Sequence, residues 1–323
     1  ASHDWLRLCG TFVASTTNSG VIHPEKIVFL QKIFLMSRIV CFFCAFALLL
    51  MSCQMTTEQQ LHENEIRTCV YRFDFQNFEM WTLQYVRSRM SVDLFPDVDS
   101  SLLRRLMPIG DAESAINVFL IHKNDRYFLF DTGLGSYSGG ALLDNLAAIG
   151  VSPADIDVIC ITHVHQDHIG GLLSHDTAVF PKARVYFPEK EIEGPYKNET
   201  MRQIGKAYAS RIYAFMIGGT VEGCIQTIDA SGHTPGHAVY KVDELYIIGD
   251  LIHAADLQIP HPECCAIYDE NPERAVATRK RIYHLLEEPG SWAAGMHLPY
   301  SGVMHQFKVI RYNKKDFNKN CKN

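Results

Sequence analysis

Residues 162–171 of the 323-residue chain read THVHQDHIGG. This stretch directly follows residues 156–161 (IDVICI), whose apolar character predicts a buried strand. Three histidines and one aspartate within six residues, at the point where a buried strand leaves the core, are difficult to explain by packing. Imidazole and carboxylate groups are ligands that suit Zn²⁺, so the stretch predicts a metal centre.

The spacing within the stretch suggests two ions and not one. His163 and His165 occupy alternate positions and can project together, while Asp167 and His168 lie further along the turn and can reach a second ion nearby. The Gly170-Gly171 pair lets the backbone turn tightly under these side chains. The alternative is a chance cluster of surface histidines, which would need no such turn.

The composition is that of a globular protein of enzyme size. Apolar residues make up 47% of the chain and charged residues 20%, which argues against general disorder. The net charge is -6 and no long basic run is present, which disfavours a nucleic-acid partner. The ten cysteines show no zinc-ribbon spacing, and the redox state of Cys264-Cys265 stays open.

Strands and helices are expected to alternate around the metal stretch. Strand-like segments occupy residues 79–92, 117–121, 127–130, 156–161, 225–228, 238–241 and 245–248, and helical ones occupy residues 142–149, 199–217 and 272–286. The last helix begins at Asn271-Pro272, a favourable cap followed by a favourable first residue. Alternation of this kind predicts α/β layers, and residues 70–310 contain no internal repeat or linker that would divide them.

The metal stretch and three later features of the sequence together resemble a known family. The HxHxDH run, a later histidine, a Gly-Asp pair after an apolar strand and a late histidine together resemble the metallo-β-lactamase superfamily over about residues 112–300. The resemblance implies an α/β fold in the form of a four-layer αββα sandwich. It also implies two divalent metal ions, with zinc the expected metal. The implied ligands of the first ion are His163, His165 and His237; those of the second are Asp167, His168 and His297; Asp250 bridges the two.

The resemblance assigns further roles near the ligands. Asp131 ends a strand in a DTG turn, where the family uses the carboxylate to orient a ligating histidine. A hydroxide held between the two ions would attack the substrate, and no G-x-S-x-G elbow signals a serine nucleophile. We expect Asp167, Asp250 and His253 to take part in catalysis. His253 could approach the substrate or the leaving group, with a structural histidine as the alternative.

The surroundings of the ligands narrow the substrate class. Residues 249–262 and 275–281 resemble the methyl parathion hydrolase group, which is similar to the N-acyl homoserine lactone lactonases. The resemblance implies a small-molecule substrate, namely a lactone, an ester or a phosphotriester, and quorum quenching as one possible role. A glyoxalase II-like thioester hydrolase shares the ligand set and is the alternative. A non-catalytic, metal-stabilised envelope binding protein is the alternative of another class.

Residues 208–217 (YASRIYAFMI) have two interpretations. They could supply aromatic and aliphatic walls over the active site, or they could belong to a plain helix that faces the core.

The N-terminal part predicts export. Residues 39–51 (IVCFFCAFALLLM) are thirteen apolar residues, short of the roughly 20 that a spanning helix needs. Met36 and Arg38 precede this run and LMSC follows its core, as in a lipoprotein signal that makes Cys53 the lipidated residue of an envelope or periplasmic protein. The alternative is a membrane anchor over residues 27–51.

The expected organisation follows from these segments. The ranges are an upstream extension (1–35), a signal peptide (36–53), a flexible tether (54–78), the hydrolase domain (79–312) and a polar tail (313–323). The oligomeric state stays open.

Overall fold

The computed structural model describes residues 70–135, 141–193, 199–299 and 301–310. The chain divides into two compact units, residues 1–61 and 62–323, and every described residue belongs to the second. The predicted extension, signal peptide and polar tail therefore lie outside the described residues, as does Cys53. In the part that is described, no helix combines the length and apolarity needed to cross a bilayer.

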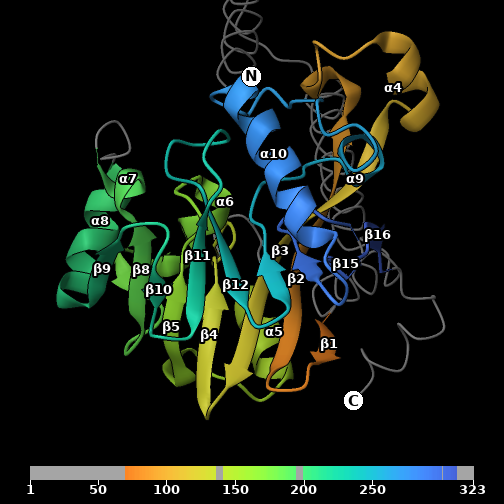
Figure 1. Ribbon diagram of the computed structural model, residues 1–323. Helices are drawn as coiled ribbons and strands as arrows, with labels where there is room; N and C mark the ends of the chain where they lie inside the picture. The colour runs from red at the N-terminus through yellow and green to blue at the C-terminus, as the bar shows by residue number, and fades with distance from the viewer. Residues whose placement is uncertain (1–69, 136–140, 194–198, 300, 311–323) are drawn as a thin grey trace, which may run out of the picture. The chain divides into compact units, whose positions relative to one another are not determined.

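Two large sheets dominate the described part of the chain (Figure 1). The first contains, in spatial order, β1 (Val70–Asp74), β2 (Glu79–Ser91), β3 (Asp111–Lys123), β4 (Arg126–Phe130), β5 (Ile156–Cys160), β8 (Arg184–Pro188) and β9 (Ile212–Phe215). The second contains β10 (Thr220–Val221), β11 (Ile225–Asp229), β12 (Ala238–Val242), β13 (Leu245–Ile247), β14 (Trp292–Ala294), β15 (Val303–His305) and β16 (Lys308–Val309). A small hairpin joins β6 (Leu173–Ser174) to β7 (Thr177–Ala178).

Side-chain alternation along the strands produces four layers. Phe128 and Phe130 of β4 face the second sheet, while Leu129 between them faces helices on the opposite side. The outer face of the first sheet is covered by α5 (Leu142–Ala148) and α8 (Glu199–Tyr208), and that of the second sheet by α10 (Pro272–Leu286). The predicted αββα sandwich is confirmed.

Shorter helices surround this frame. They are α4 (Ser100–Leu106), α6 (Gln166–Ile169), α7 (Glu189–Ile192) and α9 (Ala255–Gln258). As predicted, α10 begins after Asn271, whose side chain accepts a hydrogen bond from the Arg274 backbone N–H (3.0 Å), with Pro272 as the first helical residue.

The predicted start of the domain at residue 79 was wrong. β1 pairs antiparallel with β2, with Val70 opposite Leu83, and Phe78 is buried in the core between the sheets. Residues 70–78 therefore belong to the domain and not to the tether. The five-residue strand gains its stability from pairing with β2, a long-range interaction that its own short sequence does not reveal.

The predicted helix over residues 199–217 was correct only in its first half. α8 ends at Tyr208, and Ile212–Phe215 form β9 on the outer side of β8, with Ile212 opposite Val185. The residues of this tract are largely aromatic or β-branched and favour a strand when a sheet edge is available. The interpretation of residues 208–217 as one core-facing helix is therefore also wrong.

Candidate metal centre

The predicted site residues follow strands that end at the same edge of the sandwich. β4 and β5 run parallel in the first sheet, as do β13 and β14 in the second. The carboxyl ends of parallel strands share one edge, which is where α/β proteins bind their ligands. Asp131 follows β4, Asp250 and His297 follow β13 and β14, and the HxHxDH stretch follows β5. Segments far apart in the sequence are thereby brought together.

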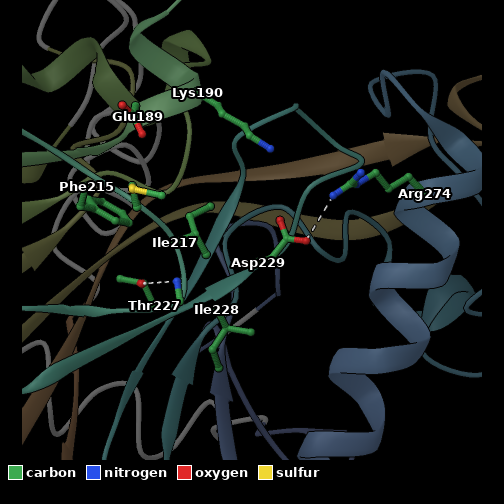
Figure 2. A pocket seen from close by; sticks show the side chains of 10 residues that line it. Glu189, Lys190, Phe215, Ile217, Thr227, Ile228, Asp229 and Arg274 are labelled. Carbon is green, nitrogen blue, oxygen red and sulfur yellow. Dashed lines mark hydrogen bonds and ion pairs between the residues drawn. The ribbon is translucent and has the colours of Figure 1, made fainter.

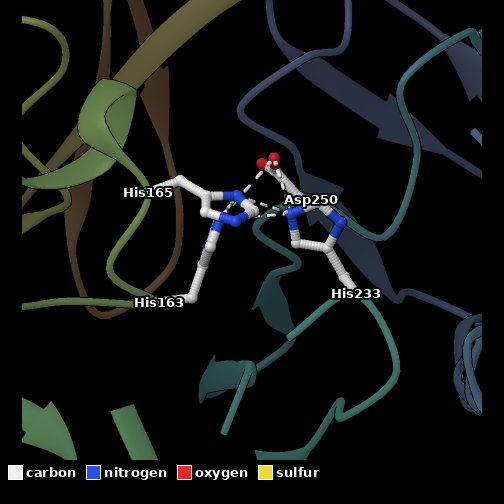
Figure 3. A group of neighbouring side chains, drawn as sticks. All are labelled: His163, His165, His233 and Asp250. Atoms are coloured by element: carbon white, nitrogen blue, oxygen red, sulfur yellow. Dashed lines mark hydrogen bonds and ion pairs between the residues drawn. The ribbon is translucent and has the colours of Figure 1, made fainter. Parts of the chain in front are cut away.

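The first cluster consists of His163, His165, His233 and Asp250 (Figure 3). His163 Nε2 lies 3.0 Å from His165 Nδ1, and His233 Nε2 lies 3.2 and 3.1 Å from these two atoms. A tetrahedral ion with bonds of about 2.0 Å spaces its ligand atoms about 3.3 Å apart. Three converging imidazole nitrogens at this spacing fit a zinc ion.

The second cluster consists of Asp167, His168, Asp250 and His297. Asp250 Oδ2 lies 3.0 Å from His297 Nε2, and Asp250 Oδ1 lies 3.1 Å from His168 Nε2. Both atoms of this second pair, Asp250 Oδ1 and His168 Nε2, are buried. They lie close to each other, but neither atom forms a hydrogen bond. Buried polar atoms without partners are costly, and a cation would satisfy both. Asp250 belongs to both clusters, as a bridging carboxylate must.

Two anchors outside the clusters fix the rings of the second one. Asp131 accepts hydrogen bonds from His168 Nδ1, from the Thr162 backbone N–H and from the Thr162 hydroxyl, each at 2.7 Å. His297 Nδ1 lies 2.8 Å from the Ala115 carbonyl oxygen and donates to it. In both histidines the Nε2 lone pair is then directed at the cluster. Asp131 thus lies where the sequence prediction places an orienting carboxylate.

The structure brings together six of the seven predicted ligands, but His237 is in neither cluster. Its Nε2 accepts a hydrogen bond from the Asp250 backbone N–H (3.2 Å), and its Nδ1 donates to the Ala230 carbonyl oxygen (3.1 Å). The prediction that His237 is a ligand of the first ion was wrong, because both of its ring nitrogens form hydrogen bonds with the backbone. His233, which was not among the predicted ligands, lies in the first cluster in place of His237.

Glu191 connects the two loops that carry the first cluster. One carboxylate oxygen accepts from the Val164 backbone N–H (3.0 Å), between His163 and His165. The other accepts from the Thr234 hydroxyl and from the Gly236 N–H, both at 2.7 Å. No local pattern marks this residue, because it lies in a charged EKE run, yet its side chain is fully buried in the fold.

His253 lies directly beside the clusters. Its ring is 1% exposed, its Nε2 is 3.5 Å from Asp250 Oδ2, and the ring stacks on that of His297 with centroids 5.3 Å apart. Neither ring nitrogen has a hydrogen-bond partner. A buried imidazole in this condition gains free energy from any ligand that supplies one. The position agrees with the expected approach of His253 to a substrate.

The pKa values of histidines in the two clusters are shifted in opposite directions. Burial lowers the pKa of His165 to about 4 and places the pKa of His163 well below its ordinary value, so these two imidazoles are neutral at pH 7. Burial also opposes charge on His297, but Asp250 and Asp167 outweigh it and raise the pKa of His297 to about 9. The second cluster must therefore release a proton before its imidazoles bind a metal.

We expect the metal-free protein to lose stability as the pH rises through about 9. The folded-state pKa of His297 lies above its ordinary value of 6.5, so the protonated ring stabilises the fold most fully below pH 6.5. A shift of this size corresponds to a loss on the order of 3 kcal/mol. Zinc binds the neutral ring, so the zinc-induced rise in Tm should be larger at pH 8.5 than at pH 6. Thermal unfolding with and without zinc tests this; a larger rise at pH 6 would contradict it.

A separate cavity of about 480 Å³ lies away from both clusters (Figure 2). Its walls include Phe215, Ile217 and Ile228, with Lys190 and Arg274 at the edge, and none of its lining residues belongs to a cluster. Residues 215–217 line this separate cavity.

The curated relatives of this chain match it over part of their length, and several of them are hydroxyacylglutathione hydrolases. Hydroxyacylglutathione hydrolase of Aeromonas salmonicida is 28% identical over 174 residues, which are 53% of this chain and 57% of that protein. The corresponding enzyme of Aliivibrio salmonicida is 24% identical over 177 residues. The chain thus spans little more than half the length of these relatives.

Solved structures match more of the chain. AbOPH, described as a hydrolase in the β-lactamase superfamily, is 28% identical with a TM-score of 0.67, over 74% of this chain and 93% of that one. AidC, described as a dizinc quorum-quenching lactonase in complex with a product, is 25% identical with a TM-score of 0.65 over the same shares. Residues 112–282, more than half of the chain, match the metallo-β-lactamase superfamily as a sequence family. The protein belongs to the metallo-β-lactamase superfamily.

Proposed function

We propose that the protein is a dinuclear, zinc-dependent hydrolase of lactones and esters. The observation that carries the proposal is the sharing of Asp250 by two complete ligand clusters. His163, His165 and His233 would hold one ion, and Asp167, His168 and His297 the other. When bound, such ions activate water and polarise the oxygen of the substrate.

The residues of the chain would position the substrate and its protons. Asp250 would keep the two ions at a fixed separation, because it is itself held in place: its backbone N–H donates a hydrogen bond to His237 Nε2. His253 has a free ring nitrogen within 3.5 Å of Asp250 and would donate a hydrogen bond to a substrate oxygen. Asp167 is partly exposed and would exchange protons with solvent and product.

Apolar side chains beside the centre favour an uncharged substrate. Tyr268 lies 5.7 Å from the ring of His253, measured between centroids, and Ile267 precedes it. They are 43% and 58% exposed, which is unusual for large apolar residues next to a buried site. We therefore propose neutral, fairly apolar lactones or aryl esters as substrates, with phosphotriesters as side substrates. The similarity to AidC supports this class.

A thioester hydrolase is the second candidate. The specific observation in its favour is the match to hydroxyacylglutathione hydrolases, which reaches 28% identity over 174 residues. A parallel assay separates the candidates: an acyl homoserine lactone, a nitrophenyl ester, a paraoxon-type triester, a glutathione thioester and a β-lactam.

We expect the lactone or the ester to be turned over best, with activity abolished by a chelator and restored by zinc. Turnover of the thioester alone would replace the lactonase proposal with the second candidate. Binding of zinc without turnover of any of the five would instead support a non-catalytic binding protein.

We also propose export of the protein and lipidation of Cys53, on the sequence pattern alone. Expression of the full chain in a bacterium should give a membrane-fraction product that carries a lipid label. Cys53→Ser should abolish the label, whereas the control Cys44→Ser, inside the apolar run, should keep it. A mature N-terminus mapped upstream of Met36 would refute the proposal.

A further inference from the structure

The loop that carries His233 is fastened to α10 and to the segment before it. The Glu270 N–H donates to the His233 carbonyl (3.1 Å), and the Asn271 N–H donates to the Gly232 carbonyl (2.9 Å). Gly232 has φ +137°, and a Cβ there would lie 2.3 Å from the Ala275 backbone nitrogen. Only glycine permits this close approach. The backbone of the loop is thus fixed, while the ring of His233 needs an anchor of its own.

Asp269 supplies that anchor. Its Oδ1 lies 3.1 Å from His233 Nδ1, on the side of the ring opposite the cluster. A carboxylate only accepts hydrogen bonds, so Nδ1 must carry the proton and Nε2 must present its lone pair. His233 Nε2 is the atom that lies 3.2 Å from His163 Nε2. The same arrangement links Asp131 to His168 in the second cluster.

Arg279 holds Asp269 in place from inside α10. Its Nη2 donates to Asp269 Oδ2 at 3.2 Å, and both side chains are buried. Its other N–H groups donate to the carbonyl oxygens of Leu251 (2.7 Å), Pro262 (2.8 Å) and Cys264 (2.9 Å). Leu251 directly follows Asp250. One guanidinium therefore joins the loop of the shared carboxylate to the anchor of His233.

We propose that Asp269 and Arg279 form a positioning pair dedicated to the first metal site, with Asp269 orienting His233 and Arg279 holding Asp269 against the loop of Asp250. The inference rests on the proposed dinuclear function and adds to it an orienting carboxylate for the first site. Asp269 bonds a ring of the first cluster, whereas Asp131 bonds His168 of the second cluster and also the Thr162 hydroxyl, which lies 3.1 Å from His163 Nδ1 of the first. Loss of Asp269 should then weaken the first site and spare the second.

Zinc titration of the purified protein against a competing chelator tests this assignment. Asp269→Ala should weaken one of the two sites by about 10- to 100-fold, the usual cost of losing such a partner, and leave the other unchanged. Asp131→Ala should weaken the second site through His168 and the first site as well through Thr162. His233→Ala and His168→Ala serve as references for the loss of each site. Cobalt in place of zinc gives an absorption spectrum that reports the geometry of the affected site.

Conservative variants separate orientation from simple folding. Asp269→Asn keeps an acceptor oxygen and should recover part of the lost affinity. Arg279→Met should resemble Asp269→Ala in its site preference, whereas Lys280→Met, an exposed neighbour on α10, should have no effect. Once Asp269 is absent, Arg279→Met should add less loss at the first site than it causes alone, because Arg279 acts on His233 through Asp269. Circular dichroism of each variant verifies the fold.

The outcomes separate this inference from the proposed function. A folded Asp269→Ala variant that binds both ions as tightly as the parent overturns the positioning pair, and so does an equal loss at both sites. A parent protein that binds no zinc overturns the dinuclear proposal and this inference with it. Weakening of the first site alone by Asp269→Ala, together with weakening of the second site by Asp131→Ala, supports the pair.

Discussion

Asp250→Ala should remove both metal ions together and reduce hydrolysis by at least about 10³-fold. Asp250 is the residue that belongs to both ligand clusters, so its loss leaves each ion one ligand short. Metal ions stabilise developing charge by several kcal/mol, and about 4 kcal/mol corresponds to this factor. Metal analysis of the purified variant and steady-state kinetics with the best substrate measure the two effects.

The control for this experiment is His284→Ala on α10. The side chain of His284 is 84% exposed and pairs with Glu287 at the surface, so its removal should leave metal content and activity unchanged. About two ions per chain in the parent protein are required for the comparison. Retention of both ions by a folded Asp250→Ala variant would contradict the bridging role, whatever its activity.

His233→Ala and His237→Ala should differ in their effect on metal binding, although the two residues lie only four positions apart. His233 contributes a ring nitrogen to the first cluster, so its loss should lower the metal content towards one ion and abolish most activity. The ring nitrogens of His237 form hydrogen bonds with the backbone of Ala230 and Asp250, so its variant should keep two ions when folded. Its cost should appear as a lower Tm, because a buried N–H group loses its partner.

Metal analysis and thermal unfolding of the two variants under equal zinc concentrations decide between these roles. His237→Gln, which keeps a hydrogen-bonding side chain, is the matched control and should recover part of the lost Tm. A single ion in His237→Ala together with two ions in His233→Ala would restore the ligand assignment expected from the family resemblance.

Local sequence was sufficient wherever neighbouring residues form a unit. The HxHxDH stretch after β5 predicts metal ligands because their spacing in the chain sets their spacing at the strand end. The start of α10 at Asn271-Pro272 was predictable for the same reason, since a cap acts within one turn. Alternation along β4 places Phe128 and Phe130 between the sheets without reference to any distant residue.

Distant contacts decided what the local pattern left open. β1 exists because β2 pairs with it, and residues 212–215 form a strand because β8 offers an edge. Glu191 lies in a charged run, yet the two ligand loops bury it. None of these outcomes depends on nearby residues alone, so periodicity and propensity did not reveal them.

The superfamily, the layered fold and six of the seven residues in the two clusters were predictable from the sequence, because the residues concerned are close in the chain or follow predictable strands. Tertiary packing selected His233 over His237 for the first cluster. Both stand in one short SGHTPGH loop and are chemically equivalent as ligands. The choice depends on which ring finds backbone partners and which ring finds Asp269, 36 residues further along the chain. Such a partner is brought near only by the packing of α10 on the second sheet.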